Sequence, residues 1–251
     1  MKKNMVLIML FVLILIPCKL FADELVMGVG LALPPYFIEE SNSGFEMDII
    51  KEALKLKGHT VKFKFLPFAR IPVDFAAGKV DCVSTINESS GIKANYSDVH
   101  VSYQNFAITL KSNNLTINSI TDLKDKAVLA FQNAKVYLGK DFADMAEANP
   151  KYEEIANQSA QTMRLYANRT QVFVGDGNIF KYYSQNLSKY FSPEIASKID
   201  TKQEVVYHAV FPKTDYKVAF KSEQIMKDFN EGLKNIKASG LYDKLIAVYI
   251  K

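Results

Sequence analysis

Tryptophan is absent from this chain of 251 residues, and cysteine, histidine and proline are scarce, at 2, 3 and 8 residues. Two cysteines are too few for a small scaffold held together by disulfides. The three histidines share no short metal-ligand spacing, so they do not indicate a zinc site. With 49% hydrophobic and 23% charged residues, the chain is too apolar to be disordered. The composition predicts a globular protein with one large or two modest domains.

Most of the excess positive charge lies in the first 22 residues. The whole chain has 31 basic and 27 acidic residues, a formal charge of +4. Lys2, Lys3 and Lys19 lie in an opening stretch that contains no acid, so residues 23–251 hold 28 basic and 27 acidic residues. Because no basic cluster remains there, we expect no nucleic-acid partner.

The first 22 residues have the three-part layout of a secretory signal peptide. A short cationic start is followed by an apolar run of 13 residues, from Met5 to Pro17, and Ala22 is a small residue before the first acids. A membrane anchor is one alternative, but such a run spans only about 20 Å of helix, short of the ~30 Å hydrocarbon core. Cys18 suggests a lipoprotein as another alternative, although the residue before it is not small. We expect cleavage after Ala22 and a periplasmic protein.

Cleavage at that point would leave Cys82 as the single cysteine. It lies in an apolar, strand-like stretch at residues 80–83. One thiol cannot form an internal disulfide, and it cannot bind a metal without other ligands. We therefore expect a buried, unreactive thiol, with no metal and no cofactor.

Residues 25–85 alternate between short apolar runs and amphipathic stretches. The clearest helix is expected at residues 45–57, where apolar residues recur at helical spacing before Gly58. A second, short helix is expected at residues 70–77, and strands are expected at residues 25–29, 61–66 and 80–85. This order predicts an α/β domain whose sheet is covered on both faces.

A second α/β set follows without a flexible linker. Helices are expected at residues 120–124, 136–148, 160–168, 178–184, 223–238 and 241–249, and strands at residues 105–110, 127–131, 172–174 and 205–211. Two such sets joined by short crossings predict two lobes with a cleft between them, which is a preferred place for a ligand.

The order of local patterns resembles the family 3 extracellular solute-binding proteins of bacterial ABC importers. The resemblance covers nearly all of residues 23–251, and its main motifs are residues 34–36, 44–49, 67–70, 78–81, 96–98, 120–126, 172–176 and 229–243. It implies a two-lobed α/β fold of the periplasmic binding protein type, which closes around two hinge strands. Lobe 1 is expected at 23–107 and 209–251, lobe 2 at 112–203, and the hinges near 107–111 and 204–209.

The same resemblance implies which residues contact the ligand. Asp176 matches an acid that holds a ligand ammonium in relatives, and capping of the following helix is the alternative role. Phe68 matches an aromatic residue that covers the ligand side chain. The family's more upstream aromatic position is occupied by Leu33, and Tyr36 faces either the cleft or the core.

Recognition of a ligand carboxylate departs from the family pattern. Relatives use an arginine after the third strand, and residues 87–95 contain none. Arg70 and Lys93 are the candidate replacements, although lysine cannot form a bidentate pair and Arg70 can equally lie on a solvated helix face. Further hydrogen-bonding candidates are Ser84, Thr85 and Asn87 at the end of the third strand, and Gln132 and Asn133 in the position of the family's anion-binding loop.

The sequence is compatible with three functions. The leading expectation is a monomeric periplasmic receptor that captures a small polar, amino-acid-like solute for an inner-membrane ABC permease. The second is a ligand-sensing module without its own transporter. The third is a dehydratase-like enzyme with Glu88 as a base in the cleft. No histidine–carboxylate or nucleophile–base motif supports catalysis, so we expect a protein that is not an enzyme.

Overall fold

The structure is a computed structural model, and it describes residues 23–31 and 33–250. The expected signal peptide, with Cys18 and the cleavage point, lies outside the described residues. Within the described part of the chain, no helix has both the length and the apolar character needed to cross a membrane.

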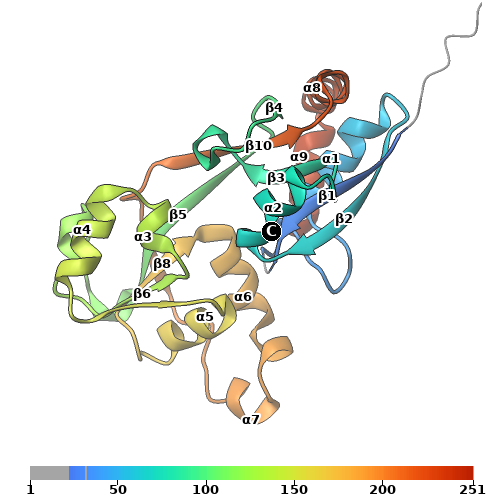
Figure 1. Cartoon of the computed structure of the whole chain (residues 1–251). Coiled ribbons are helices and arrows are strands. Elements are labelled where there is room, and N and C mark those ends of the chain that lie inside the picture. Colours follow the sequence, from blue (N-terminus) through green and yellow to red (C-terminus); the bar gives the residue numbers. More distant parts are fainter. Residues whose placement is uncertain (1–22, 32, 251) are drawn as a thin grey trace, which may run out of the picture.

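Apolar and aromatic runs form the strands of the first group, which we call lobe 1. β1 (Glu24–Gly30) lies between β2 (Thr60–Leu66) and β3 (Cys82–Ile86), and all three are parallel. β10 (Lys213–Phe220) pairs antiparallel with β3 and with the short β4 (Asn95–Tyr96). The other elements of lobe 1 are α1 (Phe45–Lys55), the single turn η1 (Phe68–Arg70), α2 (Ile71–Ala76), the single turn η2 (Glu88–Ser90), α8 (Glu223–Ala238) and α9 (Leu241–Tyr249) (Figure 1).

The second group, lobe 2, is built on another stretch of the same sheet. β6 (Val128–Phe131) lies between β7 (Tyr152–Ile155) and β8 (Val172–Asp176), all parallel, and β9 (Val205–His208) pairs antiparallel with β5 (Val101–Leu110). The remaining elements of lobe 2 are η3 (Lys111–Asn113), η4 (Ile120–Leu123), α3 (Ala134–Tyr137), α4 (Lys140–Ala148), α5 (Gln158–Tyr166), α6 (Gly177–Tyr190) and α7 (Pro193–Ala196).

The long strand β5 connects the two lobes. Its residues 101–104 pair with β10, whereas residues 105–110 pair with β8 and β9. The pairing of β5 therefore changes from lobe 1 to lobe 2 between Gln104 and Asn105. The chain returns over residues 209–212, between β9 and β10. The strand expected at residues 205–211 is confirmed over residues 205–208, and its last three expected residues belong to the return crossing.

Each lobe has an apolar core, and helix α6 of lobe 2 also packs into the core of lobe 1. The largest cluster contains the fully buried Met27 and Phe229 of lobe 1 together with Ile179 and Tyr183 of α6. In lobe 2, Phe142 and Val174 belong to a separate cluster around β6 and β8. Because burial of each such side chain contributes roughly 1.5–3 kcal/mol, both clusters contribute substantially to stability.

Helices α1 and α8 approach closely at Gly232. A Cβ atom at this position would lie 1.8 Å from the carbonyl oxygen of Ala53, and a backbone oxygen cannot rotate away. Gly232→Ala is therefore expected to lower the free energy of unfolding by about 3 kcal/mol, measured by urea denaturation. Gly91→Ala is the control, since a Cβ there meets no atom within 4 Å and only the positive φ of 71° opposes it, at about 1–2 kcal/mol. A smaller loss at Gly232 than at Gly91 would contradict this packing.

Candidate functional site

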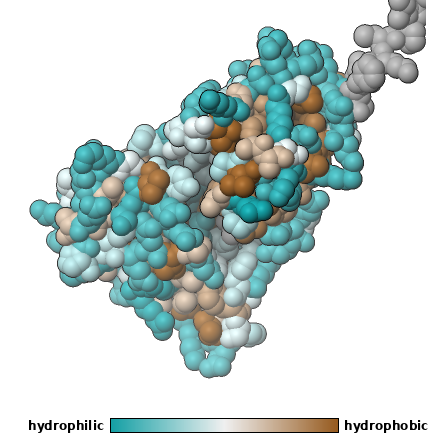
Figure 2. Space-filling model, in the orientation of Figure 1, coloured by the Kyte–Doolittle hydropathy of each residue, from teal (hydrophilic) through white to brown (hydrophobic). Residues whose placement is uncertain are grey.

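A hollow between the two lobes is visible on the face shown in Figure 2, and we call it the cleft. Ligands of open α/β sheets bind outside the carboxyl ends of the strands. Every site residue expected from the sequence lies near or after the carboxyl end of a parallel strand. These residues are Tyr36 after β1, Phe68 and Arg70 after β2, Ser84, Thr85, Asn87 and Lys93 at or after the end of β3, Gln132 and Asn133 after β6, and Asp176 at the end of β8.

Asp176 is buried at the end of β8, with 4% of its surface exposed. Its carboxylate accepts hydrogen bonds from the backbone N–H groups of Asn178, Ile179 and Gln104, at 2.9, 3.0 and 3.0 Å. It thereby caps the first turn of α6, the alternative role considered from the sequence. The hydroxyl of Tyr36 donates to both carboxylate oxygens at 3.0 Å.

Burial sets the protonation of Asp176. It raises the pKa of the carboxyl to about 6, although the hydrogen bonds from Ile179, Tyr36, Gln104 and Asn178 oppose the rise. Three of those four donors are backbone groups fixed by β5 and α6. The Tyr36 hydroxyl is the side-chain donor, so it is the partner that another hydrogen-bond donor can replace without unwinding the backbone.

Tyr36 reaches lobe 2 from the core of lobe 1. Its ring stacks on Tyr103 with centroids 3.7 Å apart and packs against Phe45 at 4.5 Å. Tyr103 meets the edge of Tyr216 at 4.9 Å. Burial raises the pKa of both Tyr36 and Tyr103, so both hydroxyls stay protonated and can donate. Between cleft and core, the structure therefore places the Tyr36 ring in the core, with its hydroxyl in contact with Asp176.

Phe68 presents an open aromatic face. It lies on η1, and 45% of its surface is exposed. Its ring rests on Gly30 at the end of β1, where an added Cβ would lie 2.6 Å from the ring. Glycine at that position leaves room for the far edge of the ring, around Cζ, to approach the strand end. An exposed aromatic ring held in this way can stack on an apolar or cationic ligand group.

The two cationic residues expected to bind a ligand carboxylate, Arg70 and Lys93, both have exposed side chains. The Nε atom of Arg70 lies 3.3 Å from Asp74, four residues on in the same helical stretch, and the Arg70 side chain is 54% exposed. Asp74 also pairs with Lys64 at 3.1 Å. Lys93 is exposed. Arg70 thus has the solvated, helix-surface pairing that was its alternative role.

Glu46 organises a buried polar cluster that sequence analysis missed. Its side chain at the start of α1 is fully buried. Its carboxylate accepts from the hydroxyls of Ser84, Thr85 and Tyr103 at 2.8, 2.9 and 3.0 Å, and His100 Nε2 lies 2.8 Å away. Ser84 and Thr85 were expected to offer their hydroxyls to a ligand, but in the structure both hydroxyls donate to the buried carboxylate instead.

The end of β3 carries backbone strain. Thr85 has a φ of +57°, a conformation that β-branched residues rarely adopt, and its hydroxyl bond to Glu46 holds it there. Asn87 accepts a hydrogen bond from the backbone N–H of Ser89 and donates to the carbonyl of Asp215, at 3.2 and 3.4 Å. The bond to Glu46 therefore helps to fix the backbone at the end of β3, which forms part of the lobe 1 edge of the cleft.

The loop between β6 and α3 already holds a carboxylate. Its residues Gln132 and Asn133 are exposed. The backbone N–H groups of Asn133 and Lys135 donate to the two carboxylate oxygens of Glu154, at 2.7 and 3.1 Å. The hydroxyl of Tyr152 donates to the same carboxylate at 2.7 Å. Both glutamate and tyrosine lie on β7, a strand that the sequence analysis did not predict.

The residues considered for catalysis have other partners. Glu88 forms an ion pair with Lys217, and this contact lowers the pKa of Glu88, which makes its carboxylate a weaker base. Burial raises the pKa of the Cys82 thiol, as expected for an unreactive cysteine. Over residues 23–31 and 33–250, no group of three or more His, Cys, Asp and Glu side chains is placed to hold a metal ion.

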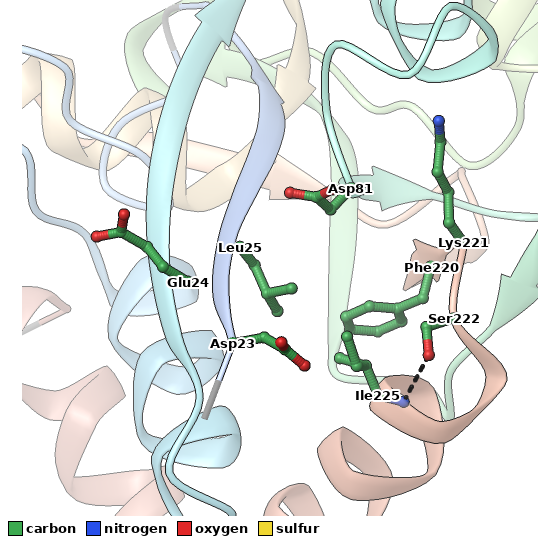
Figure 3. A pocket seen from close by; sticks show the side chains of 8 residues that line it. All are labelled: Asp23, Glu24, Leu25, Asp81, Phe220, Lys221, Ser222 and Ile225. Atoms are coloured by element: carbon green, nitrogen blue, oxygen red, sulfur yellow. Dashed lines mark hydrogen bonds between the residues drawn. The ribbon is translucent and has the colours of Figure 1, made fainter. Parts of the chain in front are cut away.

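A separate cavity of about 370 Å³ lies at the amino end of β1, whereas Gly30 lies at the carboxyl end of that strand. It is lined by Asp23, Glu24, Leu25, Asp81, Phe220, Lys221, Ser222 and Ile225 (Figure 3). Asp81 accepts a hydrogen bond from the backbone N–H of Val26, and the ammonium of Lys221 points away from the cavity. Because its polar groups do not converge, this cavity is not our candidate site.

Comparisons with known proteins agree with this architecture. The bacterial extracellular solute-binding proteins, family 3, match residues 25–251. The L-cystine-binding protein TcyK of Bacillus subtilis (strain 168) is 28% identical over 234 residues, which cover 89% of this chain and 82% of TcyK. TcyJ of the same strain, also an L-cystine-binding protein, is 23% identical over 236 residues with the same coverage. A solved ancestral arginine-binding protein bound to arginine aligns with a TM-score of 0.69 and 24% identity, covering 91% of this chain and 98% of that one.

Proposed function

Because the chain belongs to the bacterial extracellular solute-binding proteins of family 3, we propose that it captures a small amino-acid-like solute with an ammonium group. Proteins of this family are binding proteins, and the chain is a solute-binding component of amino-acid-type ABC import. We also propose that the protein works in the periplasm as a monomer and that its partner is an inner-membrane ABC permease. The buried acid Asp176, at the contact between the lobes, is the observation that carries this proposal.

Asp176 is proposed to bind the ligand ammonium. A buried carboxylate forms strong charge-assisted hydrogen bonds with a cation. The backbone donors already orient the carboxylate, and the Tyr36 hydroxyl occupies its remaining acceptor capacity. A ligand ammonium would replace that hydroxyl and add the opposite charge, which the neutral phenol does not supply.

Phe68 is proposed to cover the ligand side chain from lobe 1. The far edge of its ring lies against Gly30 and 45% of the residue is exposed, so a ligand can stack on it without a change of the core. Stacking on an aromatic ring is favourable for apolar, aromatic and cationic groups alike. This contact fits several amino-acid-like side chains.

Closure of the two lobes is proposed to enclose the ligand. The lobes are joined by two short crossings, at Gln104–Asn105 and at residues 209–212, and such crossings can absorb a hinge rotation. Closure would bring Phe68 of lobe 1 towards the lobe 2 edge that carries Asp176. A ligand enclosed in this way loses its contact with water, which strengthens the ion pair.

A thermal-shift screen tests the proposed function. We expect at least one amino acid or amine to stabilise the protein, by about 2.7 kcal/mol at 100 times its Kd. At roughly 2–4 °C per kcal/mol for a chain of this size, the melting temperature should rise by roughly 5–10 °C. Neutral mono- and oligosaccharides form the comparison set. Stabilisation by sugars alone would contradict ammonium binding.

A further inference from the structure

We propose that the cleft selects an α-amino acid with an apolar side chain, which is held between Phe68 of lobe 1 and Tyr137 of lobe 2. This inference rests on the proposed function, because it assumes that the ligand ammonium binds at Asp176. It adds the chemical class of the ligand side chain. It also assigns a specificity-determining role to Tyr137, a residue that sequence analysis did not single out.

Large apolar side chains are exposed at strand ends on both sides of the cleft. Phe68 and Val73 follow β2 in lobe 1, and Val136 and Tyr137 follow β6 in lobe 2. Tyr137 is 56% exposed. Figure 2 shows hydrophobic residues on both sides of the hollow. Exposed apolar side chains that gather around a concave site indicate that the site binds an apolar group.

Tyr137 is supported by a second aromatic ring. Its ring stacks on Phe131 with centroids 6.5 Å apart and an interplanar angle of 22°. Phe131 is the last residue of β6, and its ring lies 3.9 Å from the place of a Cβ added at Gly175 on the neighbouring strand β8. Gly175 precedes Asp176. The supporting ring is therefore fixed next to the strand end that carries the proposed ammonium site.

Tyr216 connects Tyr137 with lobe 1. It lies on β10, and its ring meets the edge of Tyr103 in the aromatic core. Burial above all raises the pKa of Tyr216 to about 12, and the nearby Glu46, Tyr137 and Asp176 add to this rise. Because Coulomb interactions weaken with distance, Tyr137 lies on the side of lobe 2 that faces lobe 1, in the neighbourhood of Asp176.

The charges around the cleft disfavour a cationic side chain. Cations also stack on aromatic rings, so the rings alone do not distinguish apolar from cationic ligands. However, Glu88 pairs with Lys217, and the Glu154 carboxylate accepts from two backbone N–H groups and a tyrosine hydroxyl. Glu46 is fully buried in its own cluster. An enclosed cationic side chain would lose its water without gaining an ion pair from any of these three acids, whereas an apolar side chain gains by leaving water.

A panel of amino acids tests the class of the side chain. We would titrate the wild-type protein calorimetrically with L-phenylalanine, L-leucine and L-methionine as the apolar set. The charged set is L-arginine, L-lysine, L-glutamate and L-cystine, whose far end has both an ammonium and a carboxylate group. We expect the tightest apolar amino acid to bind at least about tenfold more tightly than each member of the charged set.

Tyr137→Ala should weaken binding of the tightest apolar amino acid at least about fivefold, because it removes one of the two rings that hold the side chain. Tyr137→Phe is the matched control, since it keeps the ring, and its affinity should stay within about twofold of the wild type. Because Tyr137 is largely exposed, the melting temperature of both variants without ligand should stay within about 2 °C of the wild type. Unchanged affinity in Tyr137→Ala, or an equal loss in both variants, would overturn the role of the ring.

The outcomes separate this inference from the proposed function. If a member of the charged set binds as tightly as the apolar amino acids or more tightly, the inference fails and ammonium binding stands. If no amino acid of the panel binds, the capture of an amino-acid-like solute is itself wrong, and the inference falls with it.

Discussion

Asp176→Asn is expected to weaken binding of an ammonium ligand by about 2–5 kcal/mol, a loss of roughly 30-fold to several thousand-fold in affinity. The loss is large because the carboxylate is 4% exposed, and the ligand ammonium would be left in a buried site without its counter-charge. Asparagine is also a favoured N-cap, so the first turn of α6 should remain intact. Calorimetric titration with the strongest stabiliser from the thermal-shift screen measures the effect.

Tyr36→Phe is the companion variant for Asp176→Asn. It removes the hydroxyl that donates to Asp176 and keeps the ring that stacks on Tyr103. We expect equal or tighter binding in this variant. Unchanged affinity in Asp176→Asn would contradict the ammonium site and favour a neutral solute.

The same ion pair predicts a pH dependence of binding. Because burial raises the pKa of Asp176 to about 6, the carboxyl becomes protonated below that pH and loses the charge that attracts the ligand. Affinity should therefore fall as the pH drops through about 6, approaching tenfold per pH unit, and should be level above it. In Asp176→Asn this dependence should disappear.

Glu46→Leu is expected to lower the free energy of unfolding by about 3–5 kcal/mol. The substitution keeps the burial but removes the acceptor of three hydroxyl donors and of His100, all at 3.0 Å or less. Those groups would then be buried without their partner, and the strained backbone of Thr85 would lose the bond that holds it. Urea denaturation followed by circular dichroism measures the loss.

Glu52→Leu is the control on the same helix. Glu52 forms only a partly exposed ion pair with Lys55, three residues on, so its replacement should change stability by no more than about 0.5 kcal/mol. Equal destabilisation by the two substitutions would show that the Glu46 cluster has no special role.

The helices that bury one stripe of side chains could be predicted from the sequence. The stripe containing Phe229 and Leu233 predicted α8 with its observed bounds, and Gly58 marked the end of the helical run at α1 within a few residues. These predictions succeed because apolar spacing directly records which face is buried. The α/β order followed from the same signal.

Polar strands and local breaks could not be predicted in this way. β7 contains two glutamates in four residues, and β10 begins with lysine, threonine and aspartate, so neither has a clear apolar alternation. The single helix expected at 136–148 is two helices, because Gly139 adopts a φ of +87° between them. Pairing with neighbouring strands determines the conformation of β7 and β10, and the backbone conformation of Gly139 divides the helix. Neither effect can be seen in the spacing of apolar residues.

The positions of the site residues were easier to predict than their partners. Strand order alone places Phe68, Asn133 and Asp176 at carboxyl ends, because parallel strands end on the same edge. The partners come from tertiary contacts between distant segments, such as Tyr36 with Asp176 across 140 residues. Glu154 escaped notice for this reason, since its backbone donors follow a different strand, β6.

Small-angle X-ray scattering tests most directly whether a solute is held between closing lobes. The wild-type protein and Asp176→Asn would each be measured with and without the strongest stabiliser from the thermal-shift screen. We expect the radius of gyration of the wild type to fall on addition of the solute, and that of Asp176→Asn to stay unchanged at the same concentration. A solute that stabilises the wild type strongly and leaves its radius of gyration unchanged would contradict capture by lobe closure.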